Sequence, residues 1–281
     1  MRRKVRPGPD RENESRYWLD PGWRGLSLLS ADFRTHEYAT HTHDALLVAV
    51  TEEGGSAIKA GGVPAEVHSA ALLVVNPDQP HSSRMLRSKR WRYRSLYLDL
   101  EGLSSLSEAL GLRQMPSFDE NVHLETDLVR DFLRLHRALD GPRDAFRERE
   151  LLVGAMGRLV RRHGRQRRPV PLPPADRTLL DRALRLLRDR HIEHLELLQP
   201  AEALELTQYQ LIRLLARGIG MTPHVYLTQV RLDHARDLLR GGLPIAEAAL
   251  AAGFYDQPAL SRHFKRAFGI TPRQYALAHR G

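Results

Sequence analysis

The chain has 281 residues, of which 42% are hydrophobic and 27% are charged, a balance that excludes a fibrous or wholly disordered protein. It contains no cysteine, which excludes disulfides, thiolate zinc sites and cysteine nucleophiles. Its formal net charge of +9 favours a polyanionic partner such as nucleic acid. No apolar run is long enough to cross a bilayer and no signal-peptide core follows the N-terminus, so we expect a soluble, cytoplasmic protein with no membrane partner.

The first 102 residues are predicted to form an arm followed by a β domain. Residues 1–21 are polar and Arg-rich, which predicts an arm that is disordered or lies against a neighbour. Residues 22–102 contain short β-rich runs separated by Gly and Pro turns, which predicts an antiparallel sandwich or barrel. The predicted strands are Leu26–Phe33, Ala45–Thr51, Ser56–Lys59, Leu72–Asn76 and Trp91–Leu100.

Helical periodicity begins after Leu100. Two apolar stripes at helical spacing predict amphipathic helices within residues 103–164, which either cover the sheet or pack on a second subunit. The stripes consist of Leu124, Leu128, Phe132 and Leu135, and of Leu151, Leu152, Met156, Leu159 and Val160. Residues 165–175 are basic and Pro-rich, which predicts a stiff linker to an all-helical region over residues 176–281.

The all-helical region contains an internal repeat. Leu211–Leu227 aligns with Leu260–Ala276 at a constant offset of 49 residues, and seven of the 17 positions are identical. Two copies are too few for a solenoid, so each copy is expected to be a small self-contained unit. Between them, Thr222–Arg240 predicts one connecting helix of 19 residues. Such a helix is about 28 Å long, close to the roughly 34–36 Å repeat of B-DNA.

The second copy has the pattern of a helix-turn-helix. A short helix over residues 243–252 precedes Gly253, which permits a tight turn, and Asp256 can cap a helix over residues 257–267. In that helix Leu260, Phe264 and Phe268 recur every four residues and are expected to face inward. The opposite face carries Gln257, Pro258, Ser261, Arg262 and Lys265. A helix fits the major groove, and Arg and Gln are suited to bidentate contacts with guanine and adenine.

The charge along the helical region is uneven. Residues 257–281 contain five basic side chains and no acid, whereas residues 191–212 contain four glutamates and no Lys or Arg. A solvated helix face explains such runs as readily as a DNA contact does. If the runs do contact DNA, the second copy is expected to supply more of the affinity, unless Arg217 and a helix N-terminus compensate in the first.

These motifs resemble the AraC/XylS family of bacterial transcriptional regulators. The resemblance covers roughly residues 176–281 and is carried by residues 242–249, 252–257 and 260–275. Asn76-Pro77-Asp78-Gln79-Pro80-His81 is similar to the sensory domain commonly fused ahead of it. The resemblance implies an α+β fold of two domains, a cupin-like effector-binding barrel and a tandem helix-turn-helix domain. It also implies double-stranded DNA, a small-molecule effector, a second copy of the chain and RNA polymerase as partners, and usually activation of transcription in the bacterial nucleoid.

The same resemblance implies which side chains contact DNA. In the first unit they are Tyr209, Ile212 and Arg213, and in the second Gln257, Pro258, Ser261 and Arg262, with Lys265 and Arg266 near phosphates. The first unit departs from the family pattern, because Glu205 stands where a turn glycine is usual and Pro200 lies inside the first helix. Ile212 can contact a thymine methyl group but offers no hydrogen bond to a base.

Candidate effector-binding residues lie in the β domain. They are His41, His43 and His81, together with Trp91 and Tyr93, which share one face of a predicted strand with Tyr97. Two histidines one residue apart and a third on a later strand are similar to a cupin metal site. However, Leu47 and Val48 stand where that pattern has a glutamate. The histidines therefore have three readings: metal ligands, pocket lining or structural residues. For the aromatic residues, pocket lining and ordinary core packing both remain open.

Two other functions compete with an effector-responsive regulator. One is a metal-dependent cupin enzyme fused to a DNA-binding module, which the missing glutamate disfavours. The other is a DNA-binding protein that senses no ligand, which would not require a β domain lined by aromatic and histidine side chains. The sequence therefore favours a regulator that is not an enzyme and holds no cofactor and no metal.

Overall fold

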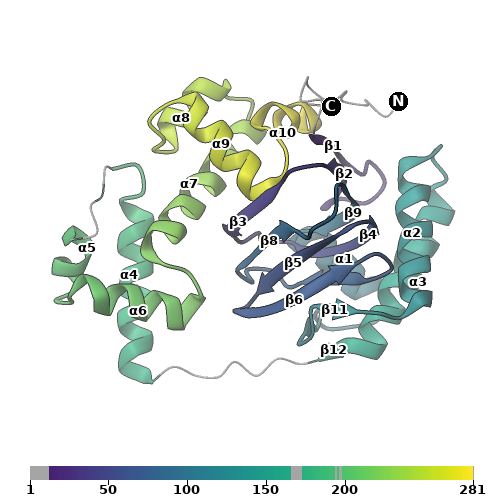
Figure 1. The fold of residues 1–281 in the computed structure, drawn as a ribbon, viewed down its shortest axis with the longest axis horizontal. Coiled ribbons are helices and arrows are strands. Elements are labelled where there is room, and N and C mark those ends of the chain that lie inside the picture. The colour runs from purple at the N-terminus through teal and green to yellow at the C-terminus, as the bar shows by residue number, and fades with distance from the viewer. Residues whose placement is uncertain (1–12, 166–172, 194, 196–197, 281) are drawn as a thin grey trace. The chain divides into compact units, whose positions relative to one another are not determined.

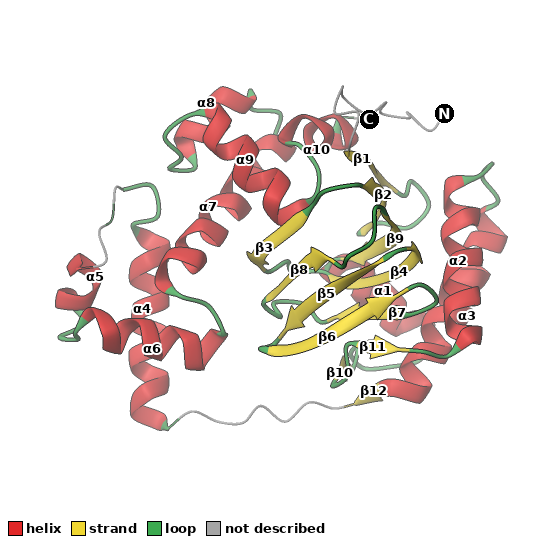
Figure 2. Ribbon diagram, viewed as in Figure 1, coloured by secondary structure: helices red, strands yellow, loops and turns green. Residues whose placement is uncertain are grey.

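The computed structural model describes residues 13–165, 173–193, 195 and 198–280. The chain divides into two compact units: the N-terminal unit comprises residues 1–37 and 42–168, and the C-terminal unit comprises residues 169–281 together with residues 38–41. The N-terminal unit contains β-sheets and helices, and the C-terminal unit is helical (Figures 1 and 2). This arrangement confirms the predicted α+β fold of two domains. Within the described residues no helix is both long and apolar enough to cross a membrane.

The larger sheet of the N-terminal unit has six strands, each antiparallel to its neighbours. Their order across the sheet is β1 (Asn13–Leu19), β2 (Leu26–Phe33), β9 (Trp91–Leu98), β4 (Leu46–Glu53), β7 (Leu72–Val75) and β11 (Val122–His123). Most residues of the central strands β2, β4 and β9 are buried. Strand β4 begins with a continuous apolar run over residues 46–50, which is typical of a strand covered on both faces.

The smaller sheet has four strands and packs against the larger one. Its order is β3 (Glu37–His41), β8 (His81–Met85), β5 (Gly55–Ala60) and β6 (Val63–His68). His43 lies in the loop between β3 and β4, and its ring contacts His81 at the start of β8 and Tyr97 on β9. The two sheets thus enclose an interior lined by alternate residues of their strands, as the predicted antiparallel sandwich or barrel requires.

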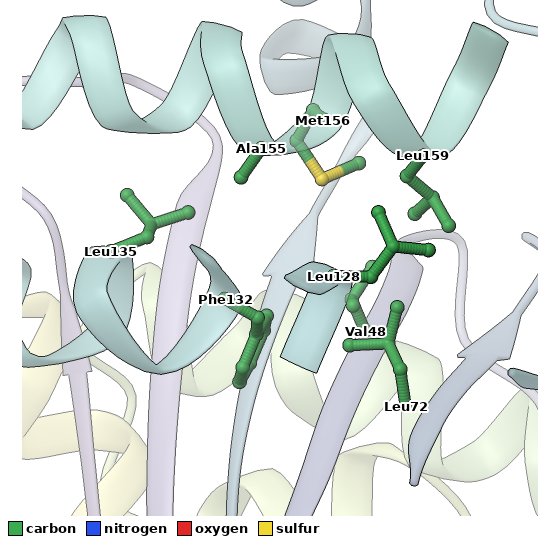
Figure 3. A pocket seen from close by; sticks show the side chains of 8 residues that line it. All are labelled: Val48, Leu72, Leu128, Phe132, Leu135, Ala155, Met156 and Leu159. Atoms are coloured by element: carbon green, nitrogen blue, oxygen red, sulfur yellow. The ribbon is translucent and has the colours of Figure 1, made fainter. Parts of the chain in front are cut away.

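Three helices cover the outer face of the six-stranded sheet. They are α1 (Leu100–Ala109), α2 (Thr126–Asp140) and α3 (Ala145–His163). Side chains of β4 and β7 and both helical stripes border a narrow apolar space between α2, α3 and the sheet (Figure 3), lined by Val48, Leu72, Leu128, Phe132, Leu135, Ala155, Met156 and Leu159. The stripes therefore cover the sheet of their own chain. Leu124 does not belong to them, because it precedes α2 and is 74% exposed.

Residues 13–19 of the predicted arm form the edge strand β1. They pair with β2 from Asn13 opposite Phe33 to Leu19 opposite Ser27. An edge strand is partly exposed and therefore tolerates polar residues. Its sequence consequently resembles that of an arm. Arg165, the first residue of the predicted linker, forms β12 with the preceding Gly164, and this strand pairs with β10 (Ser117–Phe118). The predicted linker from residue 166 to 172 and the arm up to residue 12 lie outside the described residues.

The C-terminal unit consists of α4 (Pro174–Asp189), α5 (Leu198–Ala203), α6 (Gln208–Ile219), α7 (Pro223–Arg240), α8 (Ile245–Ala251), α9 (Gln257–Phe268) and α10 (Pro272–His279). One apolar cluster joins α4, α5 and α6, with Ala183, Leu211 and Leu215 fully buried. In the second half Leu260 and Phe264 of α9 are fully buried, and Phe264 packs on Tyr275 of α10.

The sequence repeat is also a structural repeat. Helices α6 and α9 have 12 residues each, and their bounds differ by the same 49 residues as the sequence copies. Each ends at a glycine in the left-handed conformation, Gly220 at φ 72° and Gly269 at φ 69°. Each is then followed by a threonine whose side chain caps a helix with proline in its first turn, Thr222 for α7 and Thr271 for α10. The predicted connecting helix is α7, with Thr222 as its cap rather than its first residue.

Candidate functional site

The second helix-turn-helix consists of α8, a turn at Gly253 and α9. Gly253 has φ 85°, and a Cβ there would lie 2.8 Å from the backbone oxygen of His191, so a side chain has no room. Asp256 caps α9 by accepting a hydrogen bond from the backbone N–H of Ala259 at 2.6 Å. Glycine and aspartate thus fix the angle between the two helices, as the sequence predicts.

The outer face of α9 is basic and open. Gln257, Pro258, Arg262 and Arg266 are exposed, and Ser261 and Lys265 are half-buried. Neither Arg262 nor Arg266 forms an ion pair with any residue in the described part of the chain, and the helix carries no acidic residue. The predicted DNA-contacting side chains of the second unit therefore lie together on one solvent-facing surface, which we call the α9 face.

The first helix-turn-helix consists of α5, a turn at Glu205 and α6. Arg213 is exposed and Ile212 is half-buried, while the side chain of Tyr209 lies outside the described residues. Arg217, which corresponds to Arg266, is already engaged, because its Nη2 lies 3.4 Å from Oδ2 of Asp176. With the glutamates of α5 and its turn nearby, the first unit presents less uncompensated positive charge than the second.

Glu205 adopts the left-handed conformation, with φ 56°. A non-glycine residue in this conformation costs the folded state about 1–2 kcal/mol of strain. Glycine removes that strain, but it also gives the unfolded chain more conformational freedom, which offsets part of the gain in stability. We therefore expect Glu205→Gly to raise the free energy of unfolding of the C-terminal unit by up to about 1 kcal/mol. Thermal melts followed by helical circular dichroism measure this change.

Glu202→Gly is the matched control, because it removes the same charge from the interior of α5. Glycine inside a helix costs about 1 kcal/mol relative to alanine, so this variant is expected to be less stable. Equal destabilisation by both substitutions would contradict a strained turn at Glu205.

The two helix-turn-helix units are attached to opposite ends of α7. Helix α6 precedes α7 and contacts it, and α8 and α9 follow and contact it (Figure 1). Helix α7 has 18 residues. At about 1.5 Å per residue it is roughly 27 Å long, which separates the units by less than one turn of B-DNA.

The interior of the N-terminal unit brings several of the predicted effector residues together. His43 lies between His81 and Tyr97, at ring-centroid distances of 4.8 and 5.4 Å. Each of the two histidines is buried and is held by a backbone oxygen two residues away, His43 by Ala45 at 2.7 Å and His81 by Gln79 at 2.9 Å. His41 is buried, with its Nδ1 2.8 Å from the backbone oxygen of Ala39, but it belongs to the C-terminal unit and is not part of this group.

Trp91 and Tyr93 form an aromatic group with Phe33 of the neighbouring strand. The ring centroids of Trp91 and Tyr93 are 4.7 Å apart, and Phe33 lies 6.3 and 6.1 Å from them in edge-on arrangements. Trp91 Nε1 donates a hydrogen bond to the hydroxyl of Thr51 at 3.4 Å. Phe33 and Thr51 were not among the predicted site residues, because strand pairing rather than local sequence brings them beside Trp91.

The similarity of the Asn76–His81 motif to a sensory domain has a structural basis. Asn76 both accepts from and donates to the backbone of Phe118, each at 2.8 Å. Gln79 accepts hydrogen bonds from Asn76 and Asn121. These buried hydrogen bonds hold the turn between β7 and β8 in place and thereby fix the position of His81 at the start of β8. Its partners are 42 residues away in sequence, and no local pattern identifies them.

None of the three cupin-like histidines belongs to a metal-ligating group in the described residues. A group of at least three closely placed histidine and carboxylate side chains occurs there once, and it consists of His123, Glu125 and His163.

Two buried histidines make the stability of the N-terminal unit depend on pH. Burial lowers the pKa of His81 to about 4, and burial together with the charge of Arg94 lowers the pKa of His136 to about 4. Between their ordinary pKa near 6.5 and about 4, the unfolded chain binds protons that the folded chain does not. The free energy of unfolding is therefore expected to fall as the pH drops through this window and to level off below it.

Tryptophan fluorescence during urea unfolding at pH 4–7 measures this dependence, because all three tryptophans lie in the N-terminal unit. His136→Gln should flatten the pH dependence, and His68→Gln, at an exposed position, should leave it unchanged. An unchanged slope in His136→Gln would show that this histidine does not contribute.

Two family models match the chain. The AraC-like ligand binding domain matches residues 25–156, and a helix-turn-helix domain matches residues 201–278. These segments correspond to most of the N-terminal unit and to α5–α10.

Curated relatives match across both units. An uncharacterised HTH-type transcriptional regulator, YbfI of Bacillus subtilis, is 25% identical over 223 residues, which covers 79% of this chain and 80% of that protein. The HTH-type transcriptional activator RhaS of Salmonella arizonae is 27% identical, with coverage of 84% of this chain and 86% of that protein. The transcriptional activator RhaR of Yersinia pestis is 31% identical over 127 residues, 45% of this chain and 43% of that protein.

Among solved structures, apo ToxT from Vibrio cholerae superposes with a TM-score of 0.54 at 12% identity, covering 90% of this chain and 97% of that chain. At this identity the likeness shows a shared two-domain fold. Taken with the two family models and the relatives that span both units, it identifies the chain. The protein is a transcriptional regulator of the AraC family, with an N-terminal ligand-binding domain and a C-terminal helix-turn-helix DNA-binding domain.

Proposed function

We propose that the protein activates transcription when a small molecule binds between the two sheets of the N-terminal unit. Activation is supported by the curated relatives RhaS and RhaR, which are transcriptional activators. RNA polymerase is then the partner that an activator recruits, and the bacterial cytoplasm is where it acts. The observation that carries the DNA-binding half of the proposal is the tandem structural repeat with its open basic α9 face.

On DNA, we assign base contacts to the exposed residues of α9 and to the corresponding positions of α6. Gln257 and Arg262 have the side chains that form bidentate hydrogen bonds with adenine and guanine. Pro258 and Ser261 lie on the same face, and Lys265 and Arg266 are one turn further on, where phosphate contacts are expected. In α6 the corresponding residues are Tyr209, Ile212 and Arg213.

For the effector, we assign the interior of the N-terminal unit, lined by His43, His81, Trp91 and Tyr93. Aromatic rings with a few polar groups are typical of small-molecule sites. Because burial lowers the pKa of His81 to about 4, its imidazole is neutral at pH 7 and has one nitrogen that donates and one that accepts hydrogen bonds. A small uncharged or anionic molecule with a ring or a chain of hydroxyl groups fits this lining.

A ligand in this interior is expected to quench the fluorescence of Trp91 and to raise the melting temperature of the N-terminal unit. Trp91→Phe should abolish most of the quenching. Trp18→Phe is the matched control, because Trp18 packs on the opposite side of the sheet, edge-on to His136 at 5.5 Å. A thermal-shift screen of sugars, amino acids and aromatic acids supplies the ligand. Quenching that survives Trp91→Phe and disappears in Trp18→Phe would place the ligand beside α2 instead.

We also propose that the protein is a homodimer in which α2 and α3 contribute to the contact. The apolar stripes of both helices are already buried against the sheet of their own chain. The contact would therefore use the polar outer faces of α2 and α3, which makes it weaker than an obligate interface.

A further inference from the structure

We infer that the N-terminal unit binds a divalent transition-metal ion, of the zinc class, through His123, Glu125 and His163. One potential ligand atom from each of the three side chains lies within 4.8 Å of the other two. His123 belongs to β11, Glu125 directly precedes α2, and His163 is the last residue of α3. Figure 1 shows this end of the helix pair beside β11 and β12. Two imidazoles and one carboxylate are a ligand set that zinc accepts, with a fourth position left for water or another ligand.

His123 is prepared as a ligand. It is 3% exposed, and its Nε2 is buried without any hydrogen-bond partner. A neutral imidazole that carries its proton on Nδ1 has a free lone pair on Nε2, so the buried Nε2 of His123 is the atom available to a metal ion.

Glu125 points toward His163 and does not serve the helix it precedes. It occupies the N-cap position of α2, yet its side chain makes no capping hydrogen bond. Instead, Oε1 of Glu125 lies 2.6 Å from Nε2 of His163. The rings of His163 and His123 are stacked at a tilt, with centroids 4.1 Å apart. Two imidazoles therefore meet one carboxylate at the mouth of a site whose innermost ligand is His123.

The cluster can adopt metal geometry with small side-chain rotations. Ligand atoms about 2.0–2.1 Å from a tetrahedral ion are roughly 3.3–3.4 Å apart, so the short contact between Glu125 and His163 would open slightly. The longest separation in the group, up to 4.8 Å, would close. Both outer ligands are partly exposed, at 36% and 22% of their side chains, which provides an entry path. Metal ligation requires deprotonated imidazole and carboxylate groups, so binding is expected to strengthen with pH.

The ion would fasten the last turn of α3 to the start of α2 and to β11. Two ion pairs already connect the same helix ends, from Asp127 to Arg158 at 3.2 Å and to Arg162 at 2.8 Å. Beyond His163 the chain continues through β12 toward residue 166. The metal would thus stabilise the segment from which the chain leaves the ligand-binding unit.

Zinc titration of the chelator-treated full chain, followed by calorimetry, tests the inference. We expect one equivalent to bind, and His123→Gln or His163→Gln to weaken binding by more than the roughly 10–100-fold that loss of a supporting hydrogen bond costs. Cobalt(II) should give the visible absorption of a low-coordinate site without a thiolate charge-transfer band, since the chain has no cysteine.

Two control variants distinguish this cluster from other histidines. His68→Gln alters a histidine–glutamate pair at 3.1 Å outside any group of three, and should leave binding unchanged. His234→Gln removes the pair in which His191 Nε2 lies 2.8 Å from His234 Nδ1, and should also leave it unchanged. Tryptophan fluorescence of the metal-free variants verifies that they fold, and His163→Gln, at a partly exposed position, provides a second variant should His123→Gln fail to fold. Absence of bound zinc, or binding that only His234→Gln abolishes, would overturn the assignment.

Discussion

Phe264→Ala is expected to unfold the C-terminal unit at temperatures where the N-terminal unit is still intact. Phe264 is fully buried in α9 and packs on Phe268 and Tyr275 at ring-centroid distances of 4.8 and 5.6 Å. Replacing a buried phenylalanine by alanine costs about 3–5 kcal/mol, a large part of the stability of a domain this small. DNA binding should be lost with the helical structure.

The two units can be followed separately in the intact protein. Tryptophan fluorescence reports only the N-terminal unit, whereas far-ultraviolet circular dichroism is dominated by the helices of both. Leu215→Ala provides the matched comparison, because Leu215 is the fully buried counterpart of Phe264 in α6 and should cost about 2–5 kcal/mol. A variant Phe264→Ala that melts like the parent protein would show that α9 does not depend on this core.

Arg262→Ala is expected to reduce affinity for the operator by about 1–3 kcal/mol, roughly 5–150-fold, and to remove the base preference at one position. Arg262 is exposed on the α9 face and forms no ion pair with any described residue. A base-specific role follows from its place one turn beyond Pro258 on the outward face of the helix. Binding to operators substituted at single base pairs, obtained from a selected random pool, measures the effect.

Arg213→Ala is the internal comparison, because Arg213 occupies the corresponding position of α6. It should relax preference at a different base pair, and by less if the second unit supplies more of the affinity. An equal loss of affinity on every DNA sequence would show instead that Arg262 contacts phosphate.

The helical domain was largely predictable from the sequence because its signals are local. Helix caps at Thr207, Thr222, Asp256 and Thr271, and glycines at the helix ends, fall within a few residues of the structure they determine. Because the sequence is repeated, the same cap and glycine signals occur in both copies. Strand β2 was predicted with its observed bounds, because apolar residues recur along it from Leu26 to Phe33.

The remaining features depend on pairing across the chain. Strand β1 is a polar edge strand and β6 is a mostly exposed edge strand that contains a proline, and the sequence does not distinguish either from a loop. The polar sequence of residues 1–21 predicted an arm, whereas Tyr17 and Trp18 within it pair with Leu29 and Leu28 in the sheet. The cluster of His123, Glu125 and His163 spans 40 residues and forms only because α2 and α3 pack antiparallel above β11. No spacing rule identifies such a group.

Hydroxyl-radical footprinting of the full-length protein on a selected operator tests the central claim most directly. If the two helix-turn-helix units read DNA as a pair held by α7, protection should appear on one side of the duplex at two successive major grooves, about 10 base pairs apart. Arg262→Ala should weaken only one of the two protected regions. Protection of a single groove, with no change on substitution in α6, would contradict the tandem arrangement.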